Sequence, residues 1–141
     1  MKINKLAIMF MGICLFQGGY AEPDPAFLFK QAQAYYQASD YEEALSSIKQ
    51  AVKLSPDNSD YQHFLGKCYG RVAENANWLK AMSLTRKTRE AFEKAVELDH
   101  HNVSALRDLM SFYRRAPGFL GGDRNKADKI ERLLSMIDVP G

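Results

Sequence analysis

The sequence predicts an all-α protein of six helices, paired into three hairpins that stack side by side. Two observations support this fold class. Apolar residues recur at steps of three and four, which is the spacing of one face of an α-helix. Related segments also recur, since Tyr35 and Tyr69 stand in similar surroundings 34 residues apart. A recurrence of about 20–50 residues indicates one supersecondary unit that is repeated and stacked.

The N-terminal segment is expected to be a signal peptide rather than part of the fold. Lys2 and Lys5 precede the apolar run 6–16, and the small residues Gly19 and Ala21 follow it. This order is typical of a secretory signal peptide, with cleavage after Ala21. The run has 11 residues, fewer than the roughly 20 that a helix needs to cross a bilayer. We therefore expect export, to the bacterial periplasm, and no integral membrane span.

An alternative for the same segment is an outer-membrane lipoprotein, in which Cys14 would become the acylated N-terminus. The bulky Ile13 directly before it argues against this. After cleavage, the mature domain 22–141 holds 17 basic and 17 acidic residues, because two of the 19 basic residues leave with the signal peptide. A neutral chain gives no reason to expect a nucleic-acid partner. Cys68 is the one cysteine left, so no internal disulfide can form.

Two antiparallel helices are expected at the start of the domain. Asp24 and Pro25 are a typical cap and first-turn residue. The apolar stripe predicted for the first helix is Phe27, Leu28, Gln31, Ala32 and Tyr35. Asp40 with Glu43 fits a capping box for the second helix, which Pro56 would end. Its predicted stripe is Ala44, Ile48, Ala51, Val52 and Ser55.

The same halves recur later as "YQHFLGKCYG", "KTREAFEKAVELDHHN" and "ALRDLMSFYRRA". They resemble the tetratricopeptide repeat, whose pattern is W-x₂-L-G-x₂-Y…A-x₃-F…P. Three copies are expected, at about 25–58, 59–102 and 103–140. The matching residues are Leu28, Ala32, Tyr35, Ala44, Ile48 and Pro56, then Leu65, Gly66, Tyr69, Thr88, Phe92 and His100, then Leu106, Leu109, Tyr113 and Ala127. The third copy is the poorest match, with Glu131 at its Phe position.

The second and third copies contain insertions between their two helices. Ten extra residues in "VAENANWLKAMSLTRK" lack Gly and Pro, so we expect extra helical turns. Trp78, Leu79 and Met82 there either pack against a neighbour or form an exposed apolar anchor for a partner.

The other insertion is the segment 116–127, "APGFLGGDRNKA", in which the glycines at 118, 121 and 122 permit positive φ or close backbone approach. Asp123 is expected to cap the last helix. Phe119 and Leu120 either fold back over the extended pair, at an edge shared by both insertions, or belong to a binding loop.

No constellation typical of catalysis is present. His100 and His101 are adjacent, which suits an interrepeat turn, and Cys68 is expected to be a packed thiol. "GFLGGD" lacks the spacing and the lysine of a phosphate loop. We therefore expect no enzyme, no cofactor and no metal site.

The resemblance implies a concave groove lined by the first helix of each copy. The residues it places there are Phe29, Gln33, Tyr36, Gln37, His63, Lys67, Arg71, Arg107, Ser111 and Arg114. That face would carry four cations and almost no acid, so it would attract an acidic or carboxylate-ended polypeptide. The carboxylate-clamp residues of the family are absent, because Phe29 and Gln33 occupy two of their positions. A chaperone-tail binder is therefore not expected.

These residues predict a non-catalytic protein-interaction adaptor. The alternative is a small ligand-binding or enzymatic module with 116–127 as a lid. The last helix has no further hairpin to cover it, so Leu133, Leu134 and Ile137 are expected to stay half-exposed, self-associate or meet a partner.

Overall fold

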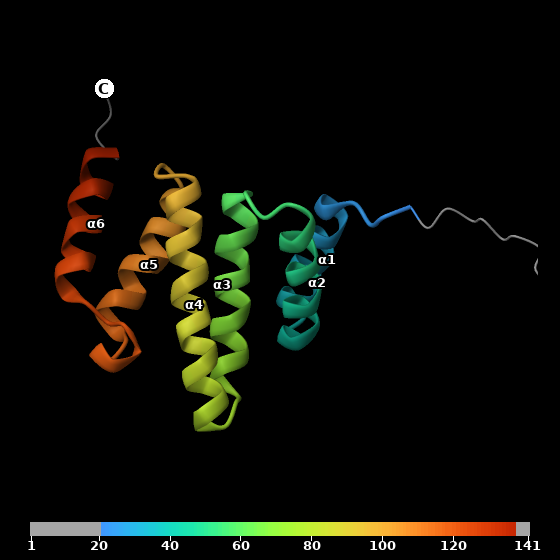
Figure 1. The fold of residues 1–141 in the computed structure, drawn as a ribbon, viewed down its shortest axis with the longest axis horizontal. Coiled ribbons are helices and arrows are strands. Elements are labelled where there is room, and N and C mark those ends of the chain that lie inside the picture. The colour runs from blue at the N-terminus through green and yellow to red at the C-terminus, as the bar shows by residue number, and fades with distance from the viewer. Residues whose placement is uncertain (1–20, 138–141) are drawn as a thin grey trace, which may run out of the picture.

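The computed structural model describes residues 21–137, and within that range it contains helices and turns but no strand. The predicted signal peptide, the alternative at Cys14 and the last residues of the third copy lie outside the described residues, apart from Ala21. The helices are α1 (Pro25–Gln37), α2 (Tyr41–Leu54), α3 (Ser59–Glu74), α4 (Trp78–Leu98), α5 (Val103–Arg115), the short 3₁₀ helix η1 (Gly118–Leu120) and α6 (Arg124–Ile137). The prediction of three antiparallel helical hairpins is confirmed (Figure 1).

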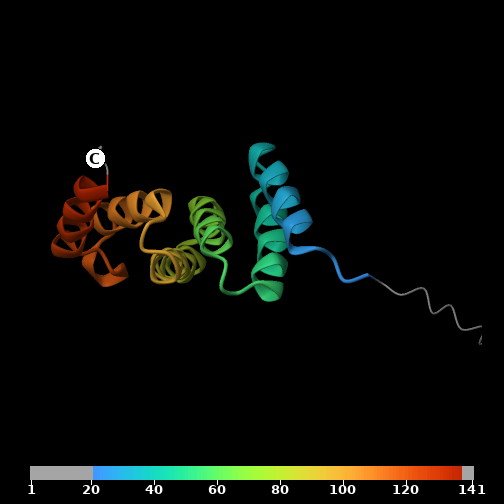
Figure 2. The same cartoon turned by 90° about the horizontal axis from the view of Figure 1, so that it is seen from above.

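The hairpins stand in a row, and their turns are sorted between two edges (Figure 1). The turns within hairpins, at 38–40, 75–77 and 116–123, lie at one edge. The turns between hairpins, at 55–58 and 99–102, lie at the other. Successive hairpins are also rotated, since α3 and α4 are seen end-on in the view that shows α1 and α2 lengthwise (Figure 2). A row of hairpins in which each packs on the next is a solenoid.

Helix starts follow local capping chemistry. In five helices a side-chain oxygen accepts a hydrogen bond from a backbone N–H of the first turn, which satisfies one of the unpaired donors found there. The capping residues are Asp24, Asn58, Asn77, Asn102 and Asp123. The caps expected at Asp24 and Asp123 are therefore confirmed.

The capping box expected at the start of α2 is wrong. The side chain of Asp40 accepts no capping hydrogen bond. In a capping box Glu43 would reach back to the backbone N–H of Asp40, but that N–H already donates to the carbonyl oxygen of Tyr35 at 2.9 Å. The tight turn through Ser39, with φ of 65°, makes this bond possible.

The core consists of two apolar clusters. One joins α1–α3 to α4 around Leu28, Ile48 and Cys68, and the other joins α4 to α5 and α6 around Phe92 and Leu109. Leu28 and Ile48 are buried as predicted from the helical stripes.

Two expectations about side-chain exposure are wrong, both at the ends of the row. Phe27 is 61% exposed, because no described helix covers that side of α1. At the other end Leu134 of α6 is buried, because it faces inward, whereas its neighbour Met136 is exposed. Leu133 and Ile137 are half-buried.

No helix among residues 21–137 is both long and apolar enough to cross a membrane.

The ten-residue insertion consists of helical turns, as expected. Compared with α1 and α2, α3 is three residues longer and α4 is seven residues longer. At a rise of 1.5 Å per residue, the extra turns of α4 add about 10 Å. The α3–α4 hairpin therefore projects beyond its neighbours at the edge of the within-hairpin turns (Figure 1).

Candidate functional site

A groove of about 650 Å³ crosses the face formed by the first helices of the hairpins. Tyr36 of α1 lies at one end, and Ser111 and Arg115 of α5 lie at the other. Lys67 and Arg71 of α3 lie between them. Side chains of α4 also contribute to the lining, so both helices of the second hairpin take part.

Four of the ten residues predicted for the groove line it: Tyr36, Lys67, Arg71 and Ser111. The structure places the other six elsewhere: Phe29, Gln33, Gln37, His63, Arg107 and Arg114. Whether any of the ten binds a partner stays a prediction. For three of the six, the contacts explain why they lie outside the groove.

Phe29 packs into an aromatic cluster. Its ring centroid lies 4.8 Å from that of Tyr61 and 5.4 Å from that of Phe64. Tyr36 meets the other side of Phe64 at 5.3 Å. These ring pairs join α1 to α3, and contacts of this kind favour tilted or edge-on geometry at such distances. Phe29 therefore holds the first two hairpins together.

His63 is not on an open face, contrary to expectation. Its side chain is 12% exposed, and its Nε2 atom lies 2.7 Å from Oδ2 of Asp108. This contact joins α3 to α5, and the imidazole ring also lies beside Phe92. His63 therefore fixes the third hairpin against the second. Asp108 also brings to the groove wall an acidic group that was not predicted there.

Arg71 is largely neutralised, so it adds little net positive charge to the groove. Its guanidinium binds the carboxylate of Glu74 at 2.9 Å and donates to the Tyr41 hydroxyl at 2.7 Å. Hydrogen bonds with Ser39 and Arg71 lower the pKa of the Tyr41 phenol. Glu74 lies three residues after Arg71, so its spacing along the helix already indicated this pair.

Arg114 binds α6 rather than the groove. Its guanidinium lies 2.8 Å from Glu131 and 3.8 Å from Asp128. The neighbouring Arg115 lines the groove in its place. Arg115 is not among the residues predicted for the groove, although it lies four residues after Ser111 on the same helical face.

Lys67 is the second cation on the groove wall without a bound carboxylate. Its Nζ atom lies 5.3 Å from the ring centroid of Tyr36 and 5.7 Å from that of Phe64, within the range of a cation–π contact. Burial raises the pKa of the Tyr36 phenol. Lys67 and Arg115 thus present two positive charges on a wall of aromatic and hydroxyl side chains.

The thiol and the histidine pair lie in opposite surroundings. Cys68 is fully buried, and this burial raises the pKa of its thiol to about 12. The prediction of a packed thiol is confirmed. His100 and His101 are exposed in the turn between α4 and α5, as expected. Among residues 21–137, no three His, Cys, Asp or Glu side chains gather closely enough to hold a metal ion.

Comparison with known families supports the repeat that the sequence resembles. The sequence model of the tetratricopeptide repeat matches residues 25–58, the bounds predicted for the first copy and the span of α1 and α2. Residues 25–58 are therefore similar to a tetratricopeptide repeat. A search of the curated proteins found no match. The other two hairpins continue the same helical solenoid.

The 116–127 segment is a closed, hydrogen-bonded loop. The carbonyl oxygen of Pro117 accepts from the backbone N–H groups of Leu120 and Gly122, at 2.9 and 3.1 Å. The N–H of Asp123 donates to the carbonyl oxygen of Tyr113 at 2.9 Å, which ties the end of the loop to α5. The loop backbone is therefore fixed at both ends.

Two glycines of this loop, Gly121 and Gly122, are required for different structural reasons. Gly121 has a φ of 96°, which side chains disfavour, and a Cβ there would overlap the guanidinium of Arg89. A Cβ on Gly122 would overlap the carbonyl oxygen of Ala116. The first glycine lets η1 lie against α4, and the second lets the loop close.

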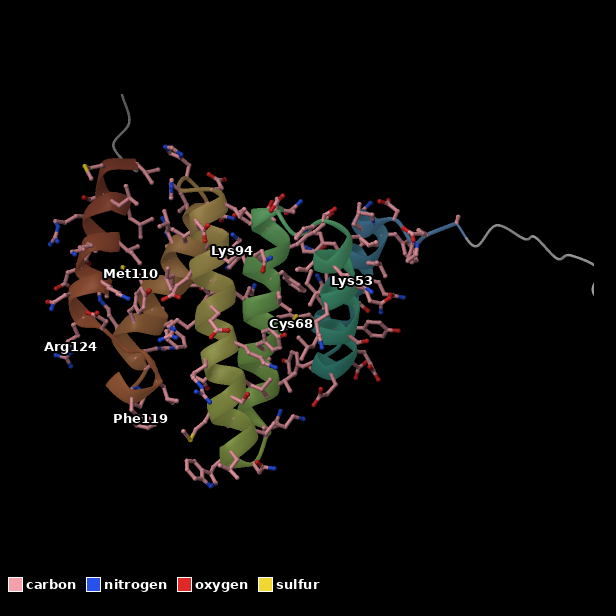
Figure 3. All side chains as sticks on the ribbon, viewed as in Figure 1. Lys53, Cys68, Lys94, Met110, Phe119 and Arg124 are labelled. Carbon is pink, nitrogen blue, oxygen red and sulfur yellow. The ribbon has the colours of Figure 1, made fainter. Side chains whose placement is uncertain are left out.

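The loop holds its two bulky residues differently. Leu120 is half-buried, whereas Phe119 is 75% exposed and projects from the edge (Figure 3). Folding back over the extended pair is therefore wrong for Phe119. Packing against a neighbour is also wrong for Trp78 and Leu79, which are 69% and 66% exposed at the start of α4, while Met82 is half-buried.

Proposed function

We propose that this protein is a non-catalytic adaptor of the bacterial periplasm that holds a segment of a partner polypeptide in its groove. The tetratricopeptide repeat supports the general role, since such repeats commonly mediate protein–protein interaction. The observation that supports the site is the groove, which is lined by all three hairpins. A partner lying there would contact all three repeats at once.

The charges of the groove favour an acidic segment. Glu74 and Asp108 are engaged by Arg71 and His63, respectively. Lys67 and Arg115 bind no carboxylate among the described residues, so their charges are available to a partner's Asp, Glu or C-terminus. Aromatic and hydroxyl side chains between them offer apolar contact and hydrogen bonds to a peptide backbone.

Site-specific photo-crosslinking tests the groove. A photoreactive amino acid at Ser111 is expected to capture one polypeptide in cells, and the same residue at the exposed Lys53 on α2 is the matched control (Figure 3). Lys67→Glu and Arg115→Glu should each weaken binding of the captured partner about fivefold, the effect of about 1 kcal/mol for a partly exposed ion pair. Capture of the same polypeptide at both positions, or unchanged binding by both variants, would remove the groove from the proposal.

The periplasmic location rests on residues 1–21. Mass spectrometry of the mature protein is expected to find Glu22 at the N-terminus. A lipid-modified Cys14 would support an outer-membrane assembly lipoprotein instead, and an intact Met1 would refute export by cleavage.

A ligand-binding or enzymatic module with 116–127 as a lid is less well supported. Ala116 reaches the groove, but no residue of 117–123 lines it. The loop is also tied to α5 and closed by its own hydrogen bonds.

A further inference from the structure

Three large apolar side chains are exposed at one edge of the molecule. Trp78 and Leu79 begin α4 at the projecting tip of the second hairpin, and Phe119 lies on η1 at the same edge (Figures 1 and 3). We call Trp78, Leu79 and Phe119 the apolar edge. Exposure of an apolar side chain to water costs free energy in proportion to its area, and several large apolar side chains exposed at one edge indicate an interaction site.

The backbone beneath the apolar edge is fixed. Asn77 caps α4 by accepting from the N–H of Lys80 at 3.0 Å, and the 116–123 loop is closed by backbone hydrogen bonds. The three side chains are therefore presented by ordered elements at low entropic cost to binding. They also lie outside the groove, so the proposed adaptor function does not use them.

The two segments that carry these side chains are rich in basic residues, of which Arg86, Lys87 and Arg89 lie about two to three turns of α4 from the tip. Residues 76–89 and 114–126 together hold eight Lys and Arg but one acid, whereas the whole chain holds 19 basic and 17 acidic residues. Arg89 and Arg114 are paired with glutamates. Arg115 and Arg124 are exposed at the helix ends on either side of the loop, and Lys80 pairs with the exposed Glu42.

The shape and the charge of the edge together favour one kind of partner. The tip of the α3–α4 hairpin is convex, so it cannot enclose a peptide as the groove can (Figure 1). A second copy of the chain would bring the same basic segments opposite each other, which is unfavourable. A flat and deformable anionic surface accepts both the apolar tip and the cations.

We propose that the apolar edge docks on an anionic lipid surface, with its three apolar side chains in the headgroup region. Trp is enriched at membrane interfaces, because its ring is apolar and its N–H is polar. Basic residues beside such a tip are attracted to anionic lipids, and this attraction decreases over a distance of one Debye length. The edge would hold the protein at the membrane through side chains that do not line the groove.

The single tryptophan of the chain makes the test specific, because Trp78 is the only indole in the protein. Vesicles of phosphatidylcholine with phosphatidylglycerol should shift Trp78 emission to the blue, and brominated lipid should quench it. Vesicles of phosphatidylcholine alone should do neither, and added salt should weaken the effect. Because Trp78 reports only its own surroundings, membrane contact by the apolar segment 6–16 does not imitate this signal.

Two variants distinguish binding by the apolar edge from nonspecific binding by any exposed apolar side chain. Phe119→Ser removes an exposed ring, so the fold should keep its circular dichroism spectrum while vesicle affinity falls about tenfold or more. Met136→Ser is the matched control, since Met136 is 68% exposed but lies near the end of α6, at the opposite edge. Its affinity should be unchanged.

Any of three results would overturn the proposal. Trp78 emission could stay unshifted and unquenched with anionic vesicles, or Phe119→Ser and Met136→Ser could behave alike. A blue shift produced by polyglutamate but not by the vesicles would also overturn it, and would assign the edge to an acidic polypeptide.

Discussion

Gly66 lies on the buried side of α3, where the ring of Phe92 leaves no room for a side chain. A Cβ there would come within 2.5 Å of Cδ1 and 2.6 Å of Cε1 of Phe92, and within 3.2 Å of the Thr88 carbonyl oxygen. Carbon atoms normally keep about 3.5–4.0 Å apart, so the ring would have to move about 1 Å. Phe92 is itself buried in the second apolar cluster and cannot swing into solvent.

The magnitude of Gly66→Ala follows from two opposed effects. Alanine should stabilise the helix by about 1 kcal/mol relative to glycine, whereas overpacking a filled core costs about 1–3 kcal/mol. We expect a net loss of about 1 kcal/mol in the free energy of unfolding. For a chain of this size this lowers Tm by about 4 °C.

Gly70 is the matched control, one turn further along the same helix. Its nearest neighbours would be Cγ2 and Oγ1 of Thr88, both at 3.8 Å from an added Cβ, which is ordinary contact. Gly70→Ala should therefore stabilise the protein by about 1 kcal/mol. Urea unfolding followed by circular dichroism at 222 nm measures both. A Gly66→Ala variant as stable as Gly70→Ala would refute the packing argument.

Three further predictions concern the loop, the thiol and a buried phenol. Gly122→Ala should lower stability by about 1–3 kcal/mol, since a Cβ would overlap the Ala116 carbonyl oxygen; a thermal melt like that of the parent would contradict this. Burial raises the thiol pKa of Cys68 from 9.0 to about 12, so alkylation at pH 8 should be about a thousandfold slower in the folded protein than in urea, as read by mass spectrometry of the Cys68 peptide. Burial and the 2.6 Å hydrogen bond to Glu93 raise the pKa of the Tyr113 phenol. The stabilisation of the folded state by this protonated phenol is therefore complete below pH of about 10 and declines above it. Tyr113→Phe should cost about 1 kcal/mol at pH 7 and lessen the loss of stability at high pH; an unchanged decline there would exclude this phenol as its source.

Local features of the sequence predicted the hairpins well. Capping residues, Pro56 and the three- and four-residue steps act within one or two turns, so the order of six helices follows from them. The absence of Gly and Pro from the second insertion predicted helix for the same reason. The division of this insertion between α3 and α4 depends on where the chain turns, which is at Asn75–Asn77. Several neighbouring polar residues would suit such a turn equally well, so the sequence does not predict its position.

The groove was less predictable, because its charges depend on contacts between hairpins. The pairing of His63 with Asp108 needs the rotation of the third hairpin against the second. The turn of Arg114 toward Glu131 needs the position of α6. Phe29 likewise joins a cluster whose other rings belong to α3. By contrast, the partner of Arg71 could have been found from the i,i+3 spacing of Glu74 alone.

Because the turns are sorted between two edges, those at one edge can vary in length and those at the other cannot. The segments 55–58 and 99–102 determine how one hairpin packs on the next. A change in their length would therefore alter the orientation of every hairpin that follows. The turn at 75–77 joins only two helices that already run side by side past their neighbours. A foreign epitope or reporter inserted there would extend the hairpin outward without altering the stacking, so this turn is the natural grafting point of the molecule.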